Sequence, residues 1–380
     1  MENLKVLELY SGIGGMHYAL KESSVPAEVV AAVDVSTTAN EVYRHNFPST
    51  PLWAKTIEGV TLSDFNKIGF DMVLMSPPCQ PFTRIGLQGD VSDHRTKSFL
   101  YFLDILPRLN KLPKYILLEN VKGFETSSAR NVLVRTLEEC KYTYQEFLVS
   151  PTCIGIPNAR LRYFLIAKAP PNLFSFETTV EIMVDFPSSG STNVSSYKEC
   201  SASSEPGHKT GGEQAVVYKL ETAKDLERKK SQDSDVSVRR LQNYLEEEPK
   251  DLTQYLLPPK TLLRYSMLLD IVKPTCRRSV CFTKGYGYYV EGTGSVLQTC
   301  LNTQLEDVFK SLHLLSDEEK LNQLLKLKLR YFTPREIANL LGFPAEFGFP
   351  EKITTKKQYR LLGNSLNIHV VSRLIHLMFA

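Results

Sequence analysis

The sequence lacks most of the features that would assign it to a class of protein at once. No apolar run is long enough to span a bilayer, and the acidic, lysine-containing start leads directly into a strand-like run, so we expect neither a membrane segment nor a signal peptide. No Cys-x-x-Cys pair or histidine cluster indicates a zinc site, and we expect no bound metal. The seven cysteines are odd in number and lack the spacing of a disulfide framework. This usage predicts reduced thiols and a location in the cytoplasm, with the nucleus as a second location.

The chain also lacks a large excess of charge of either sign, because its 380 residues carry a net charge of only +3. This charge is too small to indicate nucleic-acid binding by itself, so any polyanion must be bound by a local basic patch. Hydrophobic residues at 42% and charged residues at 23% are ordinary for a soluble globular protein, and the length allows two or three domains.

A cysteine between prolines is the most informative feature of the chain. The apolar run 71–75 predicts a buried parallel strand that leads into Ser76-Pro77-Pro78-Cys79-Gln80, and ligands bind beyond the carboxyl ends of such strands. The flanking prolines restrict the turn, so that the thiol of Cys79 points in one direction. A buried, inert cysteine is the weaker alternative. The loop that follows, from Arg84 to Arg95, contains glycines and charges and is predicted to act as a lid.

A glycine-rich turn near the start predicts a second part of the same site. The strand-like run 6–10 leads into Ser11-Gly12-Ile13-Gly14-Gly15 and then a helix, but His17 stands where the dinucleotide fingerprint requires a further glycine. Asp34 ends the next apolar run, 20 residues after Gly14, where a carboxylate suits the hydroxyls of a ribose. Together these features favour an adenosine-containing cofactor without a diphosphate. The alternative is a plain glycine turn with a surface aspartate.

A weaker segment, residues 52–58, ends close to the predicted cofactor site. Its position would let Ile57 cover one face of an adenine. The adjacent Glu58 is as consistent with a solvated side chain as with a functional one.

Charged side chains follow two further strands. The apolar run 115–118 delivers Glu119 to the sheet edge that carries the cysteine, where partial burial would raise its pKa and make it a candidate proton donor. A glutamate that caps the following helix is an equal alternative. Arg160 and Arg162 alternate along an extended segment, so both can face one side. Two guanidinium groups beside a cysteine would favour its thiolate and could bind a carbonyl oxygen.

The composition changes in the second half of the chain. Residues 188–212 are rich in serine and glycine and are predicted to be a disordered insertion. Order is expected again over 255–299, where basic and aromatic residues interleave in the segment 276–286. Such a segment suits phosphates and stacked bases, and an ordinary polar surface is the alternative.

Helical periodicity returns near the end. We expect one helix over 314–329 and another that begins at Pro334 with Thr333 as its cap. The turn Gly363-Asn364-Ser365 precedes a closing helix over 366–378 and could bring small polar groups against a ligand.

Six of these features, in this order, resemble the cytosine-5 methyltransferase family, which uses S-adenosylmethionine. The segment Cys281-Phe282-Thr283 further resembles the DNA methyltransferase 2 branch, whose members methylate aspartate tRNA at position 38 in the anticodon loop. Tyr10 departs from the usual phenylalanine of the family and adds a hydroxyl that needs a partner. The six features are the turn 10–15, the cysteine loop 76–80, Glu119-Asn120-Val121, the arginines 160 and 162, the block 330–344 and the turn 363–365.

The resemblance implies roles for these residues. Cys79 would add to carbon 6 of cytosine, because carbon 5 is a poor nucleophile until a thiolate has made the ring enamine-like. Glu119 would hydrogen-bond ring nitrogen 3 and the exocyclic amine, and Arg162 with Arg160 would hold the carbonyl and the thiolate side. The implied cofactor-binding residues are Tyr10, Ser11, Gly12, Ile13, Gly14, Gly15, Asp34, Ile57, Glu58, Ser76, Pro78, Asn364 and Ser365. The basic residues beside these motifs, and so the expected nucleic-acid contacts, are Arg84, Lys122, Lys284, Lys356 and Arg360.

The resemblance also implies a fold, a partner and an assembly. We expect an α/β fold with a doubly wound, mostly parallel, Rossmann-like sheet and a smaller inserted target-recognition domain. The catalytic domain would comprise residues 1–185 and a return segment 331–380, with the recognition domain at 186–330. A monomer that binds tRNA, above all aspartate tRNA, and binds DNA only weakly is the primary hypothesis. A DNA methyltransferase and a non-catalytic nucleic-acid-binding relative are the alternatives.

Overall fold

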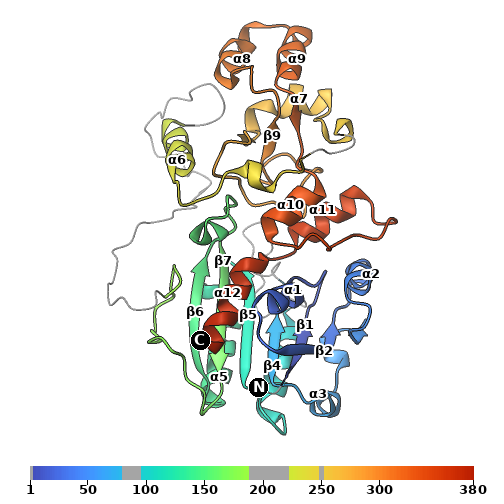
Figure 1. The fold of residues 1–380 in the computed structure, drawn as a ribbon, viewed down its shortest axis with the longest axis vertical. Helices are drawn as coiled ribbons and strands as arrows, with labels where there is room; N and C mark the ends of the chain where they lie inside the picture. Colours follow the sequence, from blue (N-terminus) through green and yellow to red (C-terminus); the bar gives the residue numbers. More distant parts are fainter. Residues whose placement is uncertain (1–2, 79–95, 188–221, 248–251) are drawn as a thin grey trace. The chain divides into compact units, whose positions relative to one another are not determined.

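The computed structural model describes residues 3–78, 96–187, 222–247 and 252–380 (Figure 1). The chain forms two compact units. The first unit comprises Met1–Cys153, Leu161–Pro187 and Leu341–Ala380, and the second comprises Ile154–Arg160 and Ser188–Leu340. The predicted insertion 188–212 lies outside the described residues. No helix of the described residues is long and apolar enough to cross a membrane.

A seven-stranded sheet in the order β3-β2-β1-β4-β5-β7-β6 forms the centre of the first unit (Figure 1). The first five strands are parallel, whereas β7 runs antiparallel to both β5 and β6. The predicted α/β fold with a mostly parallel sheet is therefore confirmed. The strand order reverses between β1 and β4, where open α/β sheets bind their ligands. The strands are β1 (Leu4–Leu9), β2 (Ala27–Val33), β3 (Leu52–Trp53), β4 (Met72–Met75), β5 (Tyr115–Val121), β6 (Thr143–Val149) and β7 (Arg162–Lys168).

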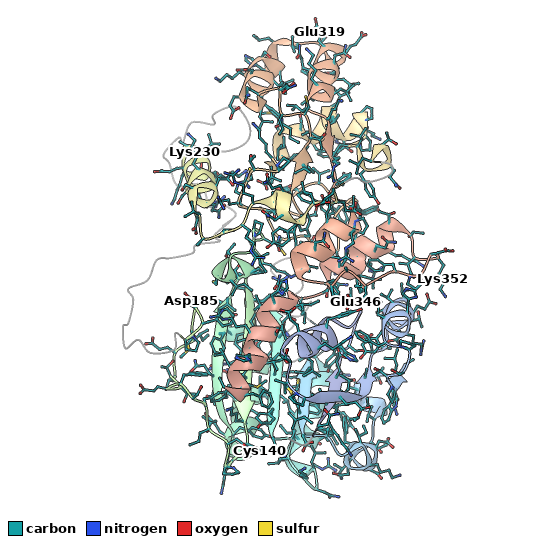
Figure 2. The ribbon with its side chains drawn as sticks, in the orientation of Figure 1. Cys140, Asp185, Lys230, Glu319, Glu346 and Lys352 are labelled. Carbon is teal, nitrogen blue, oxygen red and sulfur yellow. The ribbon has the colours of Figure 1, made fainter. Side chains whose placement is uncertain are left out.

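Helices cover this sheet because its apolar strands are buried on both faces. The closing helix α12 packs against α1 and β7, so the end of the chain returns to its start as expected (Figure 1). Lys352, labelled in Figure 2, adds an ion pair of 3.0 Å with Glu41 of α2. The helices of the first unit are α1 (Gly15–Glu22), α2 (Thr37–Asn46), α3 (Leu62–Ile68), α4 (Lys97–Ile105), α5 (Ser128–Glu139), α11 (Thr355–Gly363) and α12 (Ile368–Phe379).

The main core of the first unit lies between the sheet and helices α4 and α5. Val73 of β4 and Leu118 of β5 are fully buried there, as are Phe102 of α4 and Leu137 of α5. These side chains come from the apolar runs that predicted the strands and from one face of each helix. The sequence periodicity therefore explains this layer.

A small sheet in the order β10-β9-β8 organises the second unit. Asp270 precedes β8 and accepts hydrogen bonds from Arg278 at 2.9 Å and from Ser295 at 2.6 Å, and Lys229 lies 2.7 Å from it. Although burial opposes ionisation, these cations hold the pKa of Asp270 well below its usual range. The elements are α6 (Ala223–Ser234), α7 (Pro259–Tyr265), β8 (Ile271–Val272), β9 (Val296–Gln298), α8 (Leu305–Ser311), α9 (Asp317–Lys326), β10 (Leu329–Arg330) and α10 (Pro334–Leu341).

The expected helix over 314–329 is wrong at both ends. Helix α9 begins only at Asp317, because Ser316 and Glu319 form a capping box there. Glu319 is labelled in Figure 2. Lys328 then takes a positive φ of 47°, and the chain enters β10. A short strand thus replaces the last turn of the expected helix.

Helix α10 begins at Pro334 as predicted, and Thr333 caps it through its hydroxyl, which accepts from the Glu336 backbone N–H at 3.1 Å. Most of this helix belongs to the second unit, whereas we expected the return segment to begin at residue 331. A bidentate ion pair keeps this helix in the second unit. Arg330 of β10 donates to both carboxylate oxygens of the buried Glu336 at 2.7 Å. This pair holds the start of α10 against β10.

Candidate active site

The glycine turn between β1 and α1 adopts a backbone that only glycine tolerates at its centre. Gly14 caps α1 with a φ of +87°, and an added Cβ would lie 2.4 Å from Cε2 of Phe47. A Cβ on Gly15 would lie 3.1 Å from the Ser365 hydroxyl, so the expected turn 363–365 does meet the glycine turn. The hydroxyl of Ser11 is buried and has no hydrogen-bond partner among the described residues.

Asp34 connects this turn to the end of β2. Its Oδ2 accepts from the Gly12 backbone N–H at 2.9 Å, and its Oδ1 accepts from the Ser36 N–H at 2.7 Å. Burial raises the pKa of Asp34, and these two backbone bonds oppose the shift. Each carboxylate oxygen keeps a second lone pair, so both can still accept from the paired hydroxyls of a ribose.

The additional hydroxyl of Tyr10 has a partner in Ser98 of α4. The hydroxyl donates to Oγ of Ser98 in α4 at 3.0 Å, and this bond ties the glycine turn to the helix that follows the cysteine loop in sequence. Burial raises the pKa of Tyr10, and the nearby charge of Glu58 adds to the shift. Glu58 itself is exposed, whereas Ile57 is only 3% exposed and packs in the main core.

A buried polar cluster lies behind the glycine turn and was not foreseen from the sequence. Glu8 of β1 has no exposed surface, and its Oε2 accepts from the Tyr43 hydroxyl at 2.7 Å. His17 Nδ1 lies 2.8 Å from the same hydroxyl, and its ring stacks on Phe47 with centroids 3.8 Å apart. Burial raises the pKa of Glu8 to about 8 and lowers that of His17 to about 4. The residue that replaces a glycine of the dinucleotide fingerprint thus helps to hold α1 against α2.

The cysteine loop leaves β4 beside β5. Ser76 follows β4, and its N–H donates to the carbonyl of Leu9. The side-chain amide of Asn120 in β5 donates to the carbonyl of Pro77 at 3.4 Å. Asn120 is buried, and the sequence placed it in the motif Glu119-Asn120-Val121 without a role of its own. Pro78 is the last described residue before Cys79, and Cys79 itself, Arg84 and the predicted lid lie outside the described residues.

Glu119 lies within β5, almost buried, and pairs with Arg162 of β7. The distance from Arg162 Nε to Glu119 Oε1 is 3.4 Å. Val121 is the β-sheet partner of Arg162, so Glu119 lies two residues along β5 on the same face. The alternative that Glu119 caps the next helix is wrong, because Ser127 caps α5 and Glu119 is part of a strand.

Arg160 has different partners from Arg162. It is 3% exposed and belongs to the second unit, where it donates to the carbonyl of Phe282 at 3.0 Å and lies 3.3 Å from the Cys281 sulfur. The preceding Asn158 donates to the carbonyl of Val280 at 3.1 Å. Arg160 thus holds the predicted recognition motif in place, and Arg162 is the arginine that pairs with Glu119.

The predicted nucleic-acid contacts that the structure describes are exposed. Lys356 and Arg360 lie one turn apart on α11, and Lys122 directly follows β5. Lys284 belongs to the second unit. Asn364, a predicted cofactor contact, ends α11 and is also exposed.

Comparisons with known proteins agree over the whole chain. The family model for C-5 cytosine-specific DNA methylase matches residues 4–380. A tRNA (cytosine(38)-C(5))-methyltransferase of Homo sapiens is 61% identical over 391 residues and is covered completely, as is this chain. A DNA (cytosine-5)-methyltransferase of Dictyostelium discoideum is 38% identical, with 100% of this chain and 95% of the relative covered. A crystal structure of mutant DNMT2 from Spodoptera frugiperda has a TM-score of 0.77 at 38% identity and covers 99% of this chain and 100% of that one.

Proposed function

Because this chain belongs to the C-5 cytosine-specific DNA methylase family, we propose that it transfers a methyl group from S-adenosylmethionine to carbon 5 of a cytosine in tRNA. The proposed target is position 38 in the anticodon loop of aspartate tRNA. The name of the human relative, which specifies tRNA, position 38 and carbon 5, supports this target at 61% identity. The choice of aspartate tRNA rests on the resemblance to the DNA methyltransferase 2 branch.

The observation that carries the proposal is the adjacency of the cysteine loop and Glu119. Met75, the last residue of β4, pairs with Leu118 of β5, so the loop to Cys79 begins beside Glu119. The bond from Asn120 to the carbonyl of Pro77 holds the start of the loop in this position. A nucleophile and a carboxyl that grip one base must leave the sheet at the same edge, and neighbouring parallel strands provide this arrangement.

The residues of the glycine turn fit S-adenosylmethionine. The buried Ser11 hydroxyl would gain a partner, Gly12 and Gly14 allow close approach to the backbone, and Asp34 would accept from the ribose hydroxyls. The cofactor, when bound, supplies an electrophilic methyl group on a sulfonium.

The proposed reaction begins when the thiolate of Cys79 adds to carbon 6 of the base. Glu119 hydrogen-bonds ring nitrogen 3 and the exocyclic amine, and Arg162 holds the base carbonyl, which stabilises the charge that develops on addition. After carbon 5 is methylated, loss of its proton restores the ring double bond and expels the Cys79 thiolate. The base must leave its stack to reach Cys79, which costs least in a loop.

Methyl transfer from a radiolabelled cofactor tests the proposal. We expect transfer to an aspartate tRNA transcript and little transfer to the same transcript with uridine at position 38. Cys79→Ala should abolish transfer and leave cofactor affinity nearly unchanged, because the thiol acts on the base. A transcript with 5-fluorocytosine at position 38 should form a covalent adduct with the wild-type protein only. Methylation by the alanine variant would refute the assignment of Cys79 as nucleophile.

A DNA methyltransferase is the second candidate, favoured by the name of the Dictyostelium relative. Both substrates enter the same assay, as the tRNA transcript and as duplex DNA of matched local sequence. If DNA is methylated as well as tRNA or better, the second candidate replaces the first.

A further inference from the structure

Two adjacent tyrosines project from the second unit into solvent. Tyr288 and Tyr289 are each 63% exposed, and no other tyrosine, phenylalanine or tryptophan in the described ranges is classed as exposed. Their ring centroids lie 4.7 Å apart at an interplanar angle of 85°. This T-shaped pair offers the face of one ring and the edge of the other to a ligand. Two adjacent exposed rings offer apolar and π surface to a ligand.

The loop that contains the pair is held by the buried side chain of Tyr286. Tyr286 is buried, donates from its hydroxyl to the carbonyl of Ser295 at 2.7 Å and accepts from the Phe332 N–H at 2.9 Å. A Cβ on Gly294, which has a φ of +153°, would lie 2.5 Å from the Tyr286 ring. The close approach of the loop to this ring therefore depends on a glycine.

The backbone of the loop is also closed on itself. The N–H groups of Tyr288 and Tyr289 donate to the carbonyl of Gly285 at 3.0 and 2.9 Å. The hydroxyl of Thr293 donates to the carbonyl of Tyr289 at 2.7 Å, and the Thr283 N–H donates to the carbonyl of Thr293. Because the backbone is held at both ends, the loop need not become ordered when the rings bind a ligand.

The surrounding segment is basic. Residues 271–290 include two lysines and two arginines, and the acidic residues Asp270 and Glu291 flank this range. Arg278 pairs with Asp270 and Arg277 donates to the carbonyl of Val238, so these two guanidinium groups are used within the unit. Lys284 is exposed. An anionic ligand with flat, accessible rings suits this combination, and unpaired nucleotides have both properties.

We propose that Tyr288 and Tyr289 form a stacking platform for unpaired bases of the RNA substrate, with Lys284 placed to contact an adjacent phosphate. This inference rests on the proposed function, because it takes the substrate to be an RNA loop. A duplex hides its base faces, so the platform would favour looped over fully paired RNA. Such stacking tolerates many base sequences, because every base has a π-face.

Binding to a labelled anticodon stem–loop RNA, measured by fluorescence anisotropy, tests the platform. Tyr288→Ala and Tyr289→Ala should each weaken binding by about tenfold, as expected for the loss of one base–aromatic stack. Tyr→Phe at either position should bind within about twofold of wild type, because the ring is kept. Leu314→Ala, at an apolar side chain of the same unit that is 76% exposed, is the matched control and should bind as wild type.

Salt and substrate structure separate stacking from charge. Lys284→Ala should reduce the dependence of affinity on salt by about one phosphate contact, whereas the tyrosine variants should keep the wild-type slope. Neither tyrosine variant should alter binding to a fully paired RNA of the same composition, because a duplex hides its base faces. If the double alanine variant binds the stem–loop like wild type, or if the phenylalanine variants lose as much affinity as the alanine variants, the platform is refuted.

Methyl transfer decides the proposed function separately from the platform. If the wild-type protein methylates DNA and no tRNA, the proposed function fails, while the binding comparison still decides whether the tyrosines stack on unpaired RNA bases. If tRNA is methylated and the tyrosine variants bind normally, only the platform fails.

Discussion

Replacing the buried Glu8 with glutamine should remove a large part of the pH dependence of unfolding. Burial, reinforced by the charge of Asp34, raises the pKa of Glu8 to about 8 from its ordinary value of 4.5, although the bond from Tyr43 opposes the shift. At pH 7 the folded protein therefore holds a proton on Glu8 that the unfolded chain has released. Because the folded state binds more protons, its stability falls as pH rises from 4.5 to 8 and is level above 8.

The second buried group of the cluster has the opposite effect at lower pH. Burial lowers the pKa of His17 to about 4 from its ordinary value of 6.5, so its contribution to stability rises with pH between these values. The two contributions oppose each other up to pH 6.5, and only that of Glu8 remains from 6.5 to 8. At about 1.4 kcal/mol per pH unit, the free energy of unfolding should fall by about 2 kcal/mol across this window.

Urea unfolding measured at several pH values between 6.5 and 8 tests this reasoning. The only tryptophan of the chain, Trp53, lies in the first unit and reports on its unfolding. The Glu8→Gln variant should lose the slope of about 2 kcal/mol, because an amide does not titrate in this range. Glu28→Gln, at an exposed carboxyl of β2, is the matched control and should keep the wild-type slope. Parallel curves for wild type and Glu8→Gln would refute the assignment of a proton to Glu8 at neutral pH.

Three further predictions follow from single contacts. Gly14→Ala places a side chain at a positive φ and against the ring of Phe47, so it should lower the free energy of unfolding by about 1–3 kcal/mol. Calorimetry should show that the variant binds the cofactor at least about tenfold more weakly. Unchanged affinity would contradict the role of the turn. Arg330→Met leaves the Glu336 carboxylate buried without its partner, so denaturant unfolding should show a loss of about 3–5 kcal/mol in stability. The double variant Arg330→Met, Glu336→Leu should recover most of this lost stability. A double variant no more stable than the single one would refute this account. Tyr10→Phe keeps the ring but loses the hydrogen bond to α4, so it should lower stability by about 1 kcal/mol. Its cofactor affinity should stay within about twofold of wild type. A larger loss of affinity would show that the hydroxyl contacts the cofactor.

Strands β4 and β5 were predictable from sequence because each contains a short, continuous apolar run bounded by turn residues. The run predicted at 71–75 is β4 at Met72–Met75, and the run at 115–118 begins β5. Both deliver a motif immediately after the apolar residues end, and parallel strands place such motifs at one edge whatever the details of packing. The order of these runs along the chain therefore predicts that the motifs of Gly14, Cys79 and Glu119 lie at one edge of the sheet.

Strand direction and side-chain partners depended on the tertiary structure. The apolar run in β7 reads the same in either direction, so only its pairing with β5 decides that it is antiparallel and that Arg162 meets Glu119. The cluster of Glu8, His17 and Tyr43 joins residues up to 35 positions apart, and no local pattern marks them as partners. Periodicity reports which face of an element is apolar, whereas the choice of polar partners is made by packing between elements that are distant in sequence. Those choices determine which carboxyl is protonated and which arginine pairs with Glu119.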